Sequence, residues 1–219
     1  IMGYALKLAF LNPDQFSDIG PGAIALGMTH QQGNEIDEII TPALNQGLLG
    51  LPLDLAAINI ARGRDVGMPG LNEMRTAVGL RAYEGWADFG LNMAHPDNLV
   101  NFMAAYSFDG DVAKAAAVLA LSNGDYSALT AADAATALGL NPLDIPAAED
   151  YAFNFMNGGD KGVDAIDSWI GGLAEVHVTG GLLGETFNLV FVDQMERLQD
   201  GDRFYYLYRL VNQQFADEI

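Results

Sequence analysis

Apolar residues recur at helical spacing along most of the chain, and alternating strand-like patterns are scarce. Residues three, four and seven apart share one face of a helix, so a stripe at this spacing predicts an amphipathic helix. The pattern predicts helices over the ranges 34–49, 54–65, 71–78, 98–106, 112–122, 130–139, 166–173 and 186–198. We therefore expect a mainly α fold with little or no β-sheet.

Proline, capping and turn residues refine the expected boundaries of the helices. Pro42 lies inside the range 34–49 and is expected to kink that helix. Asp54 is well suited to cap the next helix, because its side chain can accept a backbone hydrogen bond of the first turn. Near the other end of the chain, the acidic segment 200–202 is expected to form a turn directly after the last helix.

The composition is that of a globular protein with a strong acidic bias. The 219 residues are 50% apolar, enough for one large domain or two small ones. No clear linker divides them, and the Gly- and Asp-rich range 107–160 is the best place for an insertion. The net charge of −19 disfavours binding to nucleic acids and to anionic membranes. It suits a salty or extracellular setting.

Some sites and segments are absent from the sequence. There is no cysteine, which excludes disulfides, thiolate metal sites and thiol nucleophiles. No run approaches the ~18 apolar residues of a transmembrane helix, so no membrane span is expected. The first residues, 1–4, resemble neither a signal peptide nor a natural start, so we expect further residues upstream.

The helix predicted over 54–65 has the face that says most about function. Leu55, Ile58, Asn59 and Arg62 fall on one side of a helix, half apolar and half polar. A buried amide and guanidinium need partners, because unpaired buried polar groups are costly. They either satisfy each other and the nearby backbone, or meet a ligand; from the residues alone the first reading is favoured.

Three blocks of the sequence, at residues 53–75, 167–187 and 194–205, resemble stretches of the animal-type haem peroxidases of the peroxidase–cyclooxygenase superfamily. Leu53–Asp65, with Gly67–Asn72 and Arg75, is similar to the family's LDLxAxNIxRGRDHGxPxYNxxR stretch. The second block, DSWIGGLAE followed by GETF, resembles DxWxGGLxE and GxTF, and the third resembles QFxRLxDGDRFWY. The second block covers 167–175 and 184–187, and the third covers 194–205. They stand in the family's order and span nearly the whole chain.

The resemblance implies a fold and an activity. Residues 1–219 would be the C-terminal part of a single haem peroxidase domain, in the style of bacterial multidomain secreted peroxidases. The complete enzyme would bind haem b, with covalent attachment left open, and calcium. It would reduce hydrogen peroxide, oxidise a halide or small organic donor, and so respond to oxidative stress.

The resemblance also implies roles for individual residues. Asn59 would accept a hydrogen bond from the proximal haem-ligating histidine, and Arg62 would pair with a haem propionate. Arg64 and Asp65, the turn 200–203, Trp169 and Glu175 would be scaffold. The distal histidine, catalytic arginine, calcium loop and proximal histidine would all lie upstream. No catalytic residue and no metal ligand is therefore expected within this chain.

Departures from the family pattern are few. Val66 stands where members often have histidine, and Leu71 replaces a common tyrosine. The three histidines, His30, His95 and His177, are expected to be exposed or structural, and none is expected to ligate iron. The acidic pairs at 109–111 and 200–202 do not supply a full set of calcium ligands.

Two other functions remain open from the sequence. A haem-free peroxidase-like module or fragment could serve structure or adhesion in a secreted bacterial protein, although retention of both Asn59 and Arg62 argues against loss of haem. A dioxygenase of the same superfamily would need a tyrosine radical near the haem, and none of the eight tyrosines can be assigned that role.

Overall fold

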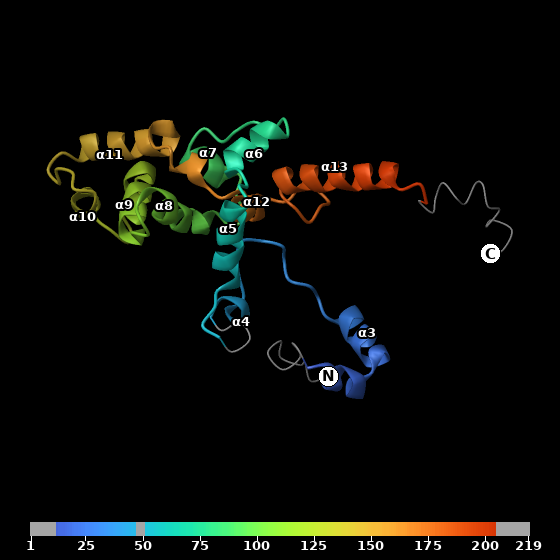
Figure 1. Cartoon of the computed structure of the whole chain (residues 1–219). Helices are drawn as coiled ribbons and strands as arrows, with labels where there is room; N and C mark the ends of the chain where they lie inside the picture. The colour runs from blue at the N-terminus through green and yellow to red at the C-terminus, as the bar shows by residue number, and fades with distance from the viewer. Residues whose placement is uncertain (1–11, 47–50, 205–219) are drawn as a thin grey trace.

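The computed structural model describes residues 12–46 and 51–204, and within them the protein is helical (Figure 1). The elements are α2 Pro13–Ile19, α3 Pro21–His30, α4 Pro42–Asn45, α5 Leu55–Asp65, α6 Leu71–Ala77, α7 Trp86–Leu91, η2 Pro96–Asn98, α8 Leu99–Ser107, α9 Val112–Asn123, α10 Ala131–Ala137, α11 Ile145–Asn154, η3 Phe155–Gly159, η4 Gly162–Ala165, α12 Ser168–Ala174 and α13 Glu185–Gly201. The described residues form only isolated bridges, Gly70 with Asp167, Met93 with Glu175 and His177 with Gly184. The mainly α prediction, without a sheet, is confirmed.

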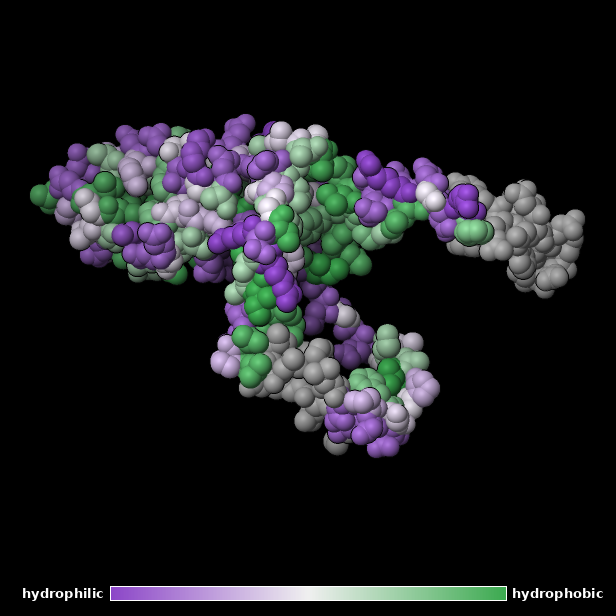
Figure 2. Space-filling view, in the orientation of Figure 1, coloured by the Kyte–Doolittle hydropathy of each residue, from purple (hydrophilic) through white to green (hydrophobic). Residues whose placement is uncertain are grey.

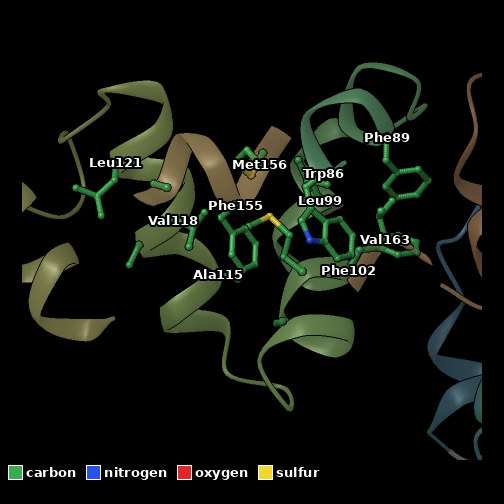
Figure 3. Packing of buried hydrophobic residues seen from close by; sticks show 14 of the residues in the cluster. Trp86, Phe89, Leu99, Phe102, Ala115, Val118, Leu121, Phe155, Met156 and Val163 are labelled. Carbon is green, nitrogen blue, oxygen red and sulfur yellow. The ribbon is translucent and has the colours of Figure 1, made fainter. Parts of the chain in front are cut away.

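The hydrophobic core lies within the middle of the chain, in a body built from α6 to α12. Every buried apolar residue of the described ranges falls between Leu71 and Ala174. Figure 3 shows part of this core, in which side chains from α7, α8, α9 and η3 meet. Its largest fully buried side chains include Trp86, Phe89 and Met103. Burial of such apolar surface is the main favourable contribution to folding.

Helix α9 organises one half of the body. Its first turn is capped by Asp111, whose side chain accepts a hydrogen bond from Lys114 N at 3.1 Å. It ends at Gly124, which adopts the left-handed conformation (φ 65°) that favours glycine at this position. Its buried face includes Ala115 and Ala117, whose small side chains let α8, α10 and α11 pack closely around it.

Two adjacent glycines allow α12 to pack against its neighbours. A Cβ atom on Gly171 would lie 2.6 Å from Ile166 Cγ2 and 2.8 Å from a Leu71 methyl. A Cβ atom on Gly172 would lie 2.7 Å from the ring of Phe187, near the start of α13. Any larger residue at either position would collide with fully buried or closely packed side chains. The two glycines of the DSWIGGLAE block are therefore packing residues.

Two parts of the chain project from the body. The helices α2 to α5 contain no buried residue, and α13 buries only Thr186. In Figure 1, α5 descends from the body toward α4 and α3, while α13 extends to the right. Figure 2 shows apolar side chains gathered along α5 and around the start of α13. Within the described residues no helix has the length and hydropathy needed to cross a membrane.

Most predicted helices are present, and two predictions need correction. The range 34–49 is not one helix: residues 31–41 are non-helical, only α4 forms, and 47–50 lie outside the described residues. The range 200–202 is not a separate turn, because α13 continues through Gly201. Four helices were not foreseen, α2, α3, α7 and α11. Asp54 does cap α5, accepting from Ala57 N at 3.1 Å.

Candidate functional site

The polar face of α5 is open. Asn59 and Arg62 lie one turn apart on the same side of the helix; Asn59 is half-buried and Arg62 is exposed. No hydrogen bond or ion pair joins either side chain to another residue in the described part of the chain. Within the described residues the two side chains do not bond to each other, as the first of the two sequence readings required. That they meet a ligand stays a prediction.

A bidentate ion pair fixes the C-terminal end of α5. Arg64 donates from Nε to Asp167 Oδ1 at 2.8 Å and from Nη2 to Asp167 Oδ2 at 2.6 Å. Tyr106, on α8, donates its hydroxyl to the same carboxylate at 2.7 Å. The hydrogen bond from Arg64 holds the pKa of Asp167 below its usual value, and burial raises the pKa of Tyr106 to about 12. These contacts tie α5 to both α8 and α12.

A second cluster is buried and joins α6 to the end of α12 and the start of α13. Arg75 donates to Glu175 Oε1 at 2.7 Å, and the two side chains are only 4% and 2% exposed. Glu175 also accepts from the Tyr83 hydroxyl at 3.0 Å and from Thr186 N at 2.8 Å. Arg75 reaches outward to Glu185 at 2.8 Å, and its guanidinium carbon lies 4.2 Å from the centre of the Tyr83 ring. Burial raises the pKa of Tyr83, so its hydroxyl remains a donor.

A third set of contacts closes the loops around α6. Asn72 donates to the carbonyl of Tyr83 at 2.9 Å and to Asp164 at 2.6 Å, and it accepts from Tyr83 N at 2.8 Å. Its amide therefore bonds on both its donor and its acceptor side. Asn72 is the asparagine of the PGLNEMR segment, and its role is to hold the chain on both sides of α6 in place.

The remaining residues singled out in the sequence are dispersed. His30 ends α3 and hydrogen-bonds to Thr29 and Leu26, whereas His95 and His177 both lie beside Glu35. No described histidine hydrogen-bonds to Asn59. In the acidic segment near the end of α13, Asp202 accepts only from Phe204 N and ties no helices together within the described residues.

The comparison with protein families decides the class of the protein. The model described as "Animal haem peroxidase" matches residues 3–121 and 159–218. The chain belongs to the animal haem peroxidase family. Residues 122–158 fall outside the matched ranges, and they include α10 and α11 of the body.

Individual peroxidases are similar over most of this chain. It is 27% identical over 205 residues to peroxinectin A of Dictyostelium discoideum, covering 92% of this chain and 28% of that protein. It is 30% identical to thyroid peroxidase of Sus scrofa over 78% of this chain and 13% of that protein. With peroxidasin of Drosophila melanogaster the identity is 31%, over 76% of this chain and 7% of that protein.

A solved structure agrees with the fold. Peroxidase A from Dictyostelium discoideum aligns with a TM-score of 0.59 and 26% identity, over 98% of this chain and 32% of that chain. The chain thus spans about a third or less of the length of each of these proteins. The animal haem peroxidase fold accounts for its helices.

From the sequence, Glu175 is predicted to be scaffold, and Arg75 has no assigned role. Arg75 and Glu175 each stand in a recognised block, but their pairing joins positions 100 residues apart, and spacing alone does not show it. A signal was present for Glu175, a charged residue directly after the apolar segment 169–174, because such a residue needs a partner when buried.

Proposed function

We propose that this chain is the C-terminal part of the catalytic domain of a haem-dependent peroxidase, which reduces hydrogen peroxide and oxidises a halide or a small organic donor. The observation that carries the proposal is the open face of α5. An amide and a guanidinium stand on a helix held firmly at one end, and neither has a partner in the described residues. Together they fit a ligand that combines a hydrogen-bond donor with carboxylates.

Haem held by a histidine is such a ligand. In the proposed arrangement the Asn59 carbonyl oxygen accepts the N–H of the iron-ligating imidazole, which orients the ring and makes it more basic. Arg62 offers its guanidinium fork to a propionate carboxylate. The bound haem would supply the redox chemistry that cleaves peroxide and oxidises the donor.

The other contacts of α5 then have a positioning function. The Arg64–Asp167–Tyr106 contacts lie less than one turn beyond Arg62 and connect the helix to the body. A catalytic group must be held within about 0.5 Å of its working position, and packing and hydrogen bonds in the surrounding shell provide this. Arg64, Asp167 and Tyr106 are positioning residues in this proposal.

The proposed enzyme needs more than this chain. The distal and proximal histidines, the catalytic arginine and the calcium loop of the family have no counterpart assigned here, and we place them upstream. The apolar surfaces of α5 and α13 are then interior surfaces of the complete domain. We further propose that the range around 107–160 is an insertion and that the parent protein is secreted by a bacterium; the unmatched residues 122–158 support the insertion.

The absorption spectrum of the natural protein that contains this chain tests the proposal, together with its intact mass. We expect a Soret band and a mass well above 23.4 kDa. Absence of the band would contradict haem binding and favour the haem-free structural or adhesion role.

A variant tests the proposed role of Asn59. In the longer protein, Asn59→Leu removes the acceptor, so we expect the Fe(III)/Fe(II) potential to rise and peroxidase turnover to fall about 10–100-fold, the usual effect of losing a partner of a metal-bound histidine. Asn123→Leu, at the exposed end of α9, is the matched control and should change neither quantity. Equal behaviour of the two variants would remove Asn59 from the haem site.

A further inference from the structure

Carboxylate and histidine side chains from three distant parts of the chain come together beside the body. Glu35 and Asp37 lie between α3 and α4, His95 precedes η2, and His177 follows α12. One ligand atom each from Glu35, Asp37 and His95 lies within 4.8 Å of the other two. Two of the three histidines of the chain are at this point.

His95 is held with one ring nitrogen free. Its Nδ1 lies 3.3 Å from Glu38 Oε2, and Glu38 is itself 5% exposed and fixed by the Asn98 amide, which donates to Oε1 at 2.6 Å. Its Nε2 faces Glu35 Oε2 at 3.7 Å. A carboxylate on one nitrogen orients the ring and leaves the lone pair of the other for a metal, an arrangement common in zinc sites.

His177 approaches Glu35 in a related way. Its Nε2 lies 2.9 Å from the carbonyl oxygen of Ile36, and because a carbonyl can only accept, Nε2 must carry the hydrogen. Its Nδ1 lies 3.7 Å from Glu35 Oε1. Both histidines therefore use one nitrogen on a fixed acceptor and present the other to the same carboxylate.

We propose that Glu35, Asp37 and His95 bind a divalent transition-metal ion of the zinc class, with His177 as the fourth residue of the site. Zinc–ligand bonds of about 2.1 Å place tetrahedral ligand atoms roughly 3.4 Å apart. Glu35 lies 3.7 Å from each histidine, and the ligand atoms of Glu35, Asp37 and His95 lie within 4.8 Å of one another. Imidazole with carboxylate suits zinc, nickel or manganese, whereas calcium takes oxygen ligands. The ion would fasten the N-terminal segment to the body.

Calorimetric titration of metal-free protein with zinc chloride, with calcium chloride in parallel, tests the site. We expect one zinc ion to bind and calcium to bind at least tenfold more weakly. His95→Asn should weaken zinc binding at least tenfold and His177→Asn less so. His30→Asn is the matched control, because His30 is exposed and its hydrogen bonds to other described residues stay within its own helix.

Three results would overturn the proposal. They are the absence of zinc binding by the unaltered protein, equal zinc affinity of the His30→Asn and His95→Asn variants, and stronger binding of calcium than of zinc. Glu35→Gln provides a check that does not depend on the histidines: Glu35 is 50% exposed and outside the core, so the variant should fold and still lose zinc affinity. A circular dichroism spectrum of each variant serves to check that the variant is folded.

Discussion

At the residue scale, the buried pair Arg75–Glu175 shows how one ion pair joins three segments. Every oxygen of Glu175 accepts a hydrogen bond, and Arg75 donates from all three of its nitrogens. Removal of one buried charge leaves the other without compensation, which costs more than the pair itself contributes. The sequence placed both residues in recognised blocks, but only the fold shows that they pair.

Replacement of one member of this pair should be strongly destabilising. We expect Glu175→Leu to lower the free energy of unfolding by about 3–5 kcal/mol, because Arg75 would lose its buried counter-charge and keep only the exposed Glu185. Arg81→Met is the control: its ion pair with Asp88 is exposed on the arginine side, and such exposed pairs contribute little to stability. Urea unfolding of the two variants measures the difference, and similar losses would show that Glu175 is not a buried anchor.

At the scale of the element, sequence pattern predicted helices where an apolar stripe faces the body. Helices α8, α9 and α12 begin within two residues of the predicted position. The prediction of one helix over 34–49 is wrong although the apolar spacing there is helical. Residues 35–38 instead face His95 and His177, and Pro42 starts a new helix. Helix α11 was missed because its buried face consists only of small residues, Ala148 and Ala152, which give no stripe of large apolar positions.

The attachment of α5 to the body should depend on pH through Asp167. The Arg64 hydrogen bond lowers the pKa of Asp167 in the folded protein. Its stabilising contribution is therefore present above the unfolded value of about 3.9 and is lost as pH falls through the lower folded value. Asp167→Asn should remove this part of the acid-induced loss of stability. Thermal unfolding from pH 7 to pH 2 measures it; an unchanged acid profile would contradict the assignment.

At the scale of the whole molecule, the body is packed and the projecting helices are not. The candidate site could be predicted only in part for this reason: Asn59 and Arg62 were found from their motif, but the groups they would meet lie outside the described residues. The outward residues of α13 include Phe191 and Met195, 53% and 44% exposed and four positions apart on one face. Large exposed apolar faces are typical of surfaces covered by another part of a protein.

The isolated 219-residue chain should therefore bind a hydrophobic dye, and the longer protein should bind much less of it. We expect the double variant Phe191→Ser/Met195→Ser to reduce dye fluorescence of the isolated chain by a large fraction. The matched control is Leu143→Ser, a single exposed apolar residue (92%) outside any such face. An equal reduction in dye fluorescence by the control would show that the apolar face of α13 does not bind the dye more strongly than a single exposed apolar residue does.

The position of the Arg64–Asp167 contacts along α5 has a mechanical consequence. They lie at the C-terminal end of the helix, whereas α4, which also contacts α5, lies away from the body (Figure 1). Arg62 is two residues from Arg64, and Asn59 is five. A change that moved α4 relative to the body would therefore tilt α5 about its C-terminal end and displace Asn59 more than Arg62.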